Sequence, residues 1–261
     1  MGALVIWGLA GWPGVPSDCT LPGGNCYCEA SQPAPDDILG KQPANTWSNL
    51  APIAAGLAIL LIADLERRRR LTGDSVANPM REGGFYAVGY GFVVLLLGPG
   101  SAAFHGSLTQ FGGWLDNLSM VAFIGFVLLY DAFRILRVDQ NRAAFLGSYS
   151  AALAALGALT WFVAGSGILI FGALVAAAVI VELVISVRGM RGLRRPLVPW
   201  LALGLTTFAV ALLIWRLSWT GAPLCEPESL LQGHALWHLL AEAVAPLMFF
   251  AYFRGETRLG P

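Results

Sequence analysis

Residues 167–188 read GILIFGALVAAAVIVELVISVR, and this stretch decides the fold of the chain. Glu182 is the only charged residue in it before Arg188. A bilayer core about 30 Å thick is crossed by a helix of roughly 20 mostly apolar residues. The stretch therefore has the length and the composition of a membrane-spanning helix.

The composition of the whole chain agrees with that interpretation. Of its 261 residues 56% are hydrophobic and only 12% are charged, whereas soluble domains carry about 25% charged residues. So few charges leave too little polar surface for a water-soluble body of this size, and we expect an integral, multi-pass membrane protein. The 16 basic and 16 acidic residues balance, and the basic ones form no continuous positive surface, so nucleic acid is not an expected partner.

The same length criterion predicts seven spans in an all-α bundle. They cover residues 46–65, 84–105, 113–136, 143–164, 167–188, 197–219 and 231–253. We expect one membrane domain over residues 1–261, with an extramembrane arm at 1–45, the bundle at 46–253 and a short tail at 254–261. Residues 3–12 are apolar but too short to span, and we expect them at the membrane interface. Only Gly165, Ser166 and Gly167 separate the fourth and fifth spans, so one long helix is the alternative there.

The positions of the basic residues predict the orientation of the bundle. Short cytoplasmic loops retain Lys and Arg, and fourteen of the sixteen basic residues lie in the first, third and fifth connections and the C-terminal tail. With seven crossings these segments all lie on one side. The sequence therefore predicts an N-terminus outside and a cytoplasmic C-terminus, and it favours separate fourth and fifth spans.

All four cysteines lie on the predicted non-cytoplasmic side, where disulfides persist. Cys19, Cys26 and Cys28 lie in the arm, and Cys225 lies between the last two spans. A bond between Cys28 and Cys225 would tie the arm to the mouth of the bundle and leave Cys19 with Cys26. Four unpaired thiols are the alternative.

The three histidines of the chain lie at one depth of the predicted bundle. His234 and His238 are four residues apart at the start of the seventh span and share one helix face. His105 ends the second span on the same side. A lone histidine near a helix end is usually an interfacial or hydrogen-bonded side chain, but catalytic zinc commonly has three protein ligands and an open position for water. Ionisable groups within a membrane mark function by default, and we expect His105, His234 and His238 to bind zinc.

Two further polar side chains are expected at the same depth. Asp116 opens the third span, where its carboxylate can exchange a proton with a zinc-activated water or merely favour the start of the helix. Ser101 lies one turn before His105. Its hydroxyl can bond a zinc-bound water or a developing oxyanion, or it can bond back to a carbonyl of its own helix. Glu242 can contact a ligand or bond within its helix, and we expect structural roles for Glu182 and Asp131.

These residues resemble those of the alkaline ceramidases, which belong to a superfamily of seven-helix hydrolases that includes the progestin and adipoQ receptors and the Per1-like proteins. The matching pieces occur in the family's order: Cys28-Glu29, Asn45-Thr46-Trp47-Ser48-Asn49, Ser101-Ala102-Ala103-Phe104-His105, Trp114-Leu115-Asp116, Cys225-Glu226 and His234-Ala235-Leu236-Trp237-His238. Each piece alone is weak, but the ordered set is specific.

The resemblance implies an activity and roles for these residues. It implies hydrolysis of the amide bond of ceramide, or of a related N-acyl lipid, to a sphingoid base and a fatty acid. It also implies zinc on the three histidines, Asp116 working with the metal-bound water, Ser101 supporting the site, and a disulfide between Cys28 and Cys225.

The N-terminal arm departs from the family in one respect. The animal ceramidases resembled here carry a calcium site in an acidic arm, and only Glu29 clearly matches it. Cys26 stands where an aspartate is expected, and Gln42 falls near the position of a second glutamate. Calcium binding is therefore in doubt, although Asp36 and Asp37 could compensate.

Two other functions are compatible with the same residues. One is an adipoQ-type receptor with structural zinc, for which the opposite orientation in the membrane is expected. The other is a lipid-remodelling hydrolase that cleaves an ester, since the same residues can support that reaction. The sequence leaves the oligomeric state undetermined.

Overall fold

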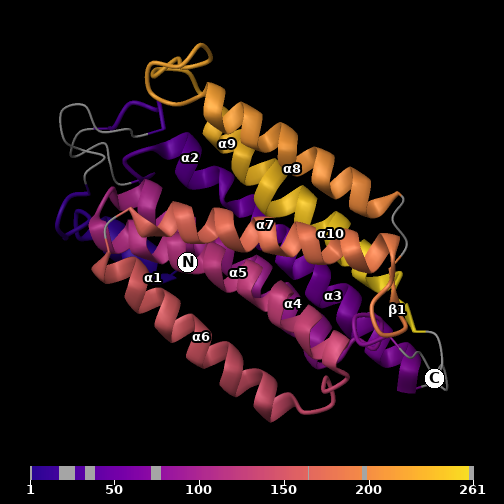
Figure 1. Cartoon of the computed structure of the whole chain (residues 1–261). Coiled ribbons are helices and arrows are strands. Elements are labelled where there is room, and N and C mark those ends of the chain that lie inside the picture. Colours follow the sequence, from indigo (N-terminus) through magenta and orange to yellow (C-terminus); the bar gives the residue numbers. More distant parts are fainter. Residues whose placement is uncertain are drawn as a thin grey trace.

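Long helices running side by side form the body of the protein (Figure 1). The computed structural model describes residues 2–17, 27–32, 39–71, 78–163, 165–195 and 199–258. Within these residues, seven helical stretches are long and apolar enough to cross a membrane: Pro43–Arg69, Phe85–Ser107, Gln110–Leu136, Arg142–Phe162, Ser166–Val187, Trp200–Leu217 and Gly233–Arg254. The predicted seven spans are confirmed, and the separation of the fourth from the fifth is confirmed with them.

The elements in chain order show where the spans are interrupted. They are α1 (Gly2–Leu9), α2 (Pro43–Ser48), α3 (Leu50–Leu71), α4 (Phe85–Ser107), α5 (Gln110–Leu136), α6 (Arg142–Phe162), α7 (Ser166–Val187), β1 (Leu193–Arg194), α8 (Trp200–Leu217), α9 (Gly233–Trp237), η3 (His238–Val244), α10 (Ala245–Arg254) and β2 (Thr257–Arg258). The first span divides into α2 and α3 at Asn49. The last span contains one π-helical segment, η3, a feature that recurs at functional sites. The described residues are otherwise helical or irregular apart from the short antiparallel pair of β1 and β2.

Helix α4 lies at the centre of the bundle, and 61% of its span is buried. It continues through Pro99, and the two glycines beside that proline allow close packing. A Cβ atom on Gly98 would lie 2.5 Å from the Asn49 carbonyl oxygen, and one on Gly100 would lie 2.6 Å from the Ser119 side chain. These glycines therefore let α3 and α5 approach the helix that carries Ser101 and His105.

The outer helices expose apolar side chains, as expected of a surface that faces lipid. Only 11% of the α6 span and 17% of the α7 span are buried. Phe162 and Leu169 are 81% and 74% exposed. These surfaces fit the expected integral membrane protein.

A buried cluster of charges closes the end of the bundle at which the chain terminates. The guanidinium of Arg195, which follows β1, donates to Asp131 at 2.6 Å, to Glu182 at 2.5 Å and to Glu256 at 2.8 Å. Arg134 adds ion pairs with Glu256 and with Asp139. The cluster joins α5, α7, the connection after β1 and the C-terminal segment, so the structural roles expected for Asp131 and Glu182 agree with their contacts.

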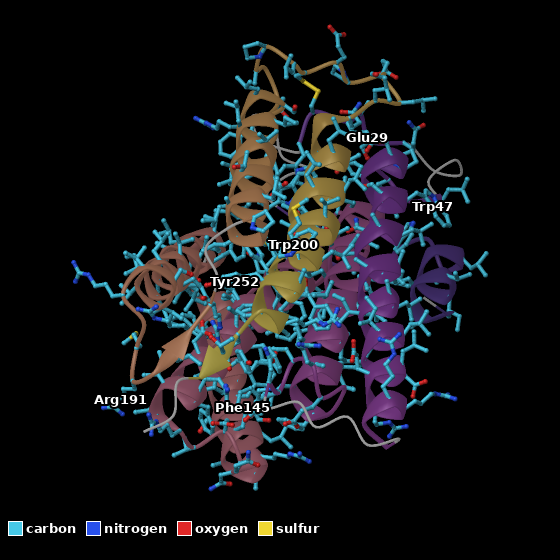
Figure 2. The ribbon with its side chains drawn as sticks, turned by 90° about the vertical axis from the view of Figure 1, so that its right-hand side faces the viewer. Glu29, Trp47, Phe145, Arg191, Trp200 and Tyr252 are labelled. Carbon is cyan, nitrogen blue, oxygen red and sulfur yellow. A yellow bond between two sulfur atoms is a disulfide. The ribbon has the colours of Figure 1, made fainter. Side chains whose placement is uncertain are left out.

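The opposite end carries α2, α9 and the N-terminal arm (Figure 1). Figure 2 shows Glu29 and the disulfide at this end and Arg191 at the other. The disulfide joins Cys28 to Cys225, with Cα atoms 5.4 Å apart, so the expected bond is confirmed. Cys19 and Cys26, like Asp36 and Asp37, lie outside the described residues.

Candidate metal centre

The three histidines meet at the end of the bundle that carries the arm. His105 lies in the last turn of α4, His234 lies in α9, and His238 begins η3. Their side chains are buried, and one nitrogen atom from each lies within 4.8 Å of the others. The Nε2 atoms of His105 and His234 are 3.0 Å apart. The structure thus brings the expected ligands together at one centre.

The outward-facing nitrogens of two histidines have polar partners. Nδ1 of His105 lies 2.8 Å from Oε1 of Gln42, and Nδ1 of His238 lies 2.7 Å from the Ser48 hydroxyl. Such contacts fix the ring orientation and the tautomer of a metal-binding histidine. They leave the two Nε2 atoms for a shared ion.

Gln42 also anchors the backbone at His105. The last carbonyl groups of a helix have no partner within that helix, and here the amides of Gln42 and Lys41 donate to the carbonyl oxygens of His105 at 3.0 Å and Gly106 at 2.9 Å. The same short segment therefore holds both the main chain and the imidazole of His105.

Asp116 and Ser101 lie beside the histidines, as the sequence predicts. Both line a cavity of about 310 Å³ together with His234 and His238. The Ser101 hydroxyl is 3.2 Å from Nε2 of His238, and the Ser101 side chain also interacts with Asp116. The structure thus places the Ser101 hydroxyl in contact with both His238 and Asp116.

Glu242 lies at the inner edge of this cavity, one helical turn beyond His238. Its carboxylate accepts a hydrogen bond from the indole of Trp237 at 3.1 Å. Its carboxylate lines the same cavity as His234 and His238, and it lies in the π-helical segment η3. The hydrogen bond within the last span is the one that the structure shows.

Glu29 connects the arm to the helix that carries Ser48. Its carboxylate accepts the amides of Ala44 at 2.7 Å and Asn45 at 2.8 Å, which satisfies free N–H groups at the start of α2. Burial raises the pKa of Glu29 above its usual value, although these amides of Asn45 and Ala44 oppose the shift. Both carboxylate oxygens of Glu29 therefore accept hydrogen bonds from the start of α2.

Tyr27 covers the histidines from the arm. Its ring stacks on that of His234 with the centroids 4.0 Å apart and the planes at 18°, and it meets the His105 ring edge-on at 5.5 Å. Burial and the nearby carboxylates of Asp116 and Glu242 raise the pKa of Tyr27, so it is a neutral phenol at neutral pH.

The chemistry of these donors fits zinc. Three buried imidazole nitrogens converge, two of the rings are oriented from outside, and the cavity beside them leaves room for a water molecule and a substrate. Metal binding itself and the roles of Asp116 and Ser101 stay predictions.

Sequence reasoning missed the contacts of Gln42, Ser48 and Tyr27 with the histidines. Ser48 lies in a matched motif, but its hydroxyl contact spans 190 residues of sequence. The sequence marks Gln42 only as standing near the position of an acidic residue in related proteins, and it does not indicate the contact of Gln42 with His105. Nothing in the local pattern around Tyr27 signals a contact with His234.

Comparison with known proteins supports the resemblance drawn from the motifs. No curated protein matches the chain. A family model described as Ceramidase matches residues 42–257, which is most of the chain and includes the three histidines, Ser101 and Asp116. With the ordered motifs and the seven-helix bundle already in place, this match shows that the chain belongs to the ceramidase family.

Proposed function

We propose that this protein is a zinc-dependent intramembrane amide hydrolase that cleaves ceramide or a related N-acyl lipid into a sphingoid base and a free fatty acid. Membership of the ceramidase family supports an amide hydrolase with a lipid substrate. The observation that carries the proposal is the convergence of three histidines beside Asp116 and Ser101 at the wall of a largely apolar cavity.

The arrangement assigns each group a task in amide hydrolysis. Zinc, when bound by the three imidazoles, supplies Lewis acidity for a carbonyl group and lowers the pKa of a water molecule. Asp116 accepts the proton of the attacking water and delivers it to the leaving nitrogen, since its carboxylate lines the same cavity. Ser101, in contact with both Asp116 and His238, donates a hydrogen bond to the carbonyl oxygen of the reacting amide as negative charge develops on it.

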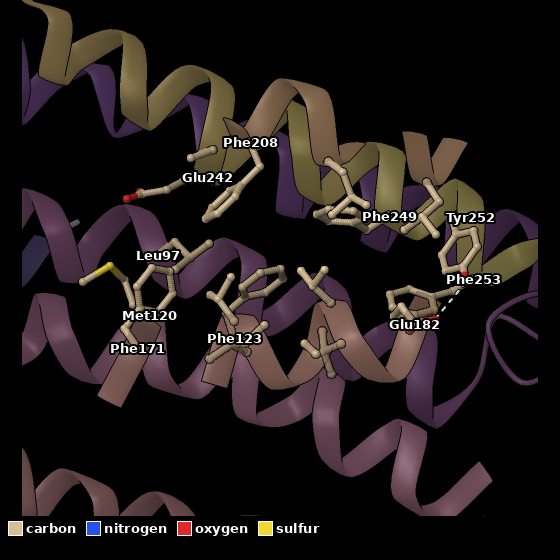
Figure 3. A pocket seen from close by; sticks show the side chains of 18 of the residues that line it. Leu97, Met120, Phe123, Phe171, Glu182, Phe208, Glu242, Phe249, Tyr252 and Phe253 are labelled. Carbon is tan, nitrogen blue, oxygen red and sulfur yellow. Dashed lines mark hydrogen bonds between the residues drawn. The ribbon is translucent and has the colours of Figure 1, made fainter. Parts of the chain in front are cut away.

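A second cavity supports a substrate with a long hydrocarbon chain. This cavity, of about 80 Å³, shares Met120, Phe171 and Trp237 with the first and extends between helices toward Glu182 and Tyr252 (Figure 3). Phe171 and Glu182 line its two ends from α7, and the rise of an α-helix places them ~16 Å apart along its axis. That is about half of the ~30 Å bilayer core, so this channel has a suitable length for one lipid chain. Its volume of about 80 Å³ requires the lining helices to move apart before the chain can enter.

The orientation follows from the charges of the connecting segments. The described parts of the arginine-rich connections, among them β1, lie at the end of the bundle opposite to α9, which carries His234 (Figure 1). Cytoplasmic loops retain such basic residues. The proposed active site therefore faces the non-cytoplasmic side. An adipoQ-type receptor is expected to have the reverse orientation.

A direct assay tests the proposed reaction. Purified full-length protein, loaded with zinc, is given a ceramide labelled in its acyl chain and, separately, an ester lipid with the same acyl chain. We expect fatty acid release from the ceramide, together with about one zinc per chain by elemental analysis. Release from the ester alone would favour the lipid-remodelling hydrolase. Folded, zinc-loaded protein that releases fatty acid from neither lipid would favour the receptor.

Filling the channel tests how the lipid chain is bound. Ala178 is buried on α7 and lines the second cavity, so Ala178→Phe places a ring in the path of the chain. We expect hydrolysis of long-chain amides to fall at least about tenfold, while short-chain amides are still cleaved. The neighbouring Ala177 lies on the exposed face of α7 and lines neither cavity, which makes Ala177→Phe the matched control. Equal activity of both variants on long-chain amides would place the lipid chain elsewhere.

A further inference from the structure

The three histidines differ in what holds the nitrogen that faces away from the centre. His105 has Gln42 and His238 has Ser48 at this position. Nδ1 of His234 is buried and has no hydrogen-bond partner among the residues that the structure describes. Metal-binding histidines almost always engage this second nitrogen, because the contact fixes the ring. Some other contact must therefore orient His234.

The aromatic ring of Tyr27 makes that contact. It lies nearly parallel to the imidazole of His234 at 4.0 Å, and the ring of His238 packs against the same imidazole edge-on at 4.6 Å. Rotation of the His234 ring about its bond to Cβ would break the parallel stack and move Nε2 away from His105. The stack thus restricts the same motion that a hydrogen bond to Nδ1 would restrict.

We propose that Tyr27 is a positioning residue for His234, and that its ring holds the imidazole by stacking where the other two histidines are held by polar contacts. The inference rests on the proposed zinc site. Tyr27 lies outside the residues matched by the family model, which begins at residue 42, so the proposal concerns this chain's own arm.

The neighbours of Tyr27 hold its ring in place. Tyr27 and Cys28 both have left-handed backbone conformations, with φ of 57° and 67°, which residues other than glycine rarely adopt. The Cys28–Cys225 disulfide and the bonds from α2 to Glu29 flank the turn, and the amide of Cys28 donates to the Thr220 hydroxyl at 3.3 Å. The turn is thus fastened to both sides of the bundle mouth, and it directs the ring inward over His234.

The experiment compares zinc affinity, by competition with a chelator, in purified full-length wild type, Tyr27→Phe, Tyr27→Met and Tyr149→Met. Tyr149 is a matched control, because its ring also stacks, on Phe145 at 15°, but in α6 and away from the histidines. We expect Tyr27→Met to weaken zinc binding by about 10- to 100-fold, the usual effect of removing a group that orients a ligand. Tyr27→Phe keeps the ring and is expected to retain the wild-type affinity, as is Tyr149→Met.

Two further measurements separate positioning from a general loss of structure. The absorption spectrum of the cobalt-substituted protein reports ligand geometry, and its bands should move in Tyr27→Met but not in Tyr27→Phe. Thermal unfolding of the metal-free proteins should show no greater loss for Tyr27→Met than for Tyr149→Met. If Tyr27→Met does not fold, the cobalt spectrum of Tyr27→Trp tests the proposal instead. An aromatic ring of another size can still stack on His234, so this variant should preserve the wild-type cobalt bands.

The outcomes distinguish this inference from the proposed function. Wild-type zinc affinity in Tyr27→Met, weakened affinity in Tyr27→Phe or altered cobalt bands in Tyr27→Trp would overturn the role of the ring and leave the zinc hydrolase intact. A wild-type protein that binds no zinc would overturn the proposed function itself.

Discussion

Asp116→Asn is expected to lower the hydrolysis of amide lipids by about 10²- to 10⁴-fold, the usual contribution of a general acid–base group, while zinc stays bound. Asparagine has nearly the shape of aspartate but accepts no proton, and Asp116 belongs to the cavity wall and not to the group of converging nitrogens. The measurements are fatty acid release from labelled ceramide and zinc content per chain. Glu228→Gln makes the same charge change in an exposed loop at the same end and should keep full activity.

His238→Ala is the companion variant, because it should lose both activity and metal. It removes one of the three proposed ligands and also the partner of Ser48 and Ser101, so zinc content should fall below that of the wild type. Normal turnover in Asp116→Asn would remove the carboxylate from the reaction. Full zinc content together with normal turnover in His238→Ala would contradict the whole site.

Arg195→Ala is expected to destabilise the fold by about 3–5 kcal/mol, the usual cost of breaking a buried ion pair by removing one partner. The Arg195 side chain is fully buried and shared by three carboxylates from different elements. Without it, Asp131, Glu182 and Glu256 remain close together with less compensating charge. Thermal unfolding in detergent micelles measures the loss, with retained secondary structure at low temperature as the check that the variant folds.

Two further substitutions serve as comparisons for Arg195→Ala. Arg194→Ala removes the same side chain from the exposed neighbouring position and should change the stability by no more than about 0.5 kcal/mol. Arg195→Lys keeps the charge but lacks the planar set of donors that reaches several carboxylates, so its loss should lie between the other two. Equal unfolding temperatures for Arg195→Ala and Arg194→Ala would show that the carboxylates are accommodated without the guanidinium.

Much of the fold could be predicted from the sequence because each span carries its own signal. A membrane helix satisfies its backbone internally and needs a long apolar stretch, so the run around Ala178 identifies a span without knowledge of its neighbours. The charge cluster could not be predicted in the same way. Arg195 lies in an arginine-rich connection and looks like one of many solvated residues, and only packing against α5 and α7 shows that it is buried.

The candidate site could likewise be predicted only in part from the sequence. The spacing of His234 and His238 is a local feature, and the shared depth of His105 follows from the topology. Two partners of these histidines, Tyr27 and Gln42, come from the arm, which has no periodic pattern and reaches the site because the described part folds back over the end of α4. The π-helical segment after Trp237, which carries His238 and Glu242, also has no recognised sequence signal here.

The Cys28–Cys225 disulfide sets an order of events during biosynthesis. The two cysteines are 197 positions apart, and the chain between them contains six of the seven candidate spans. A chain is made from its N-terminus, so the bond cannot close until all six have been synthesised. The seventh span follows Cys225 after a short connection and brings the last two histidines. The second cysteine and the last two of the three converging histidines are therefore added to the nascent chain close together in time, after the first six spans.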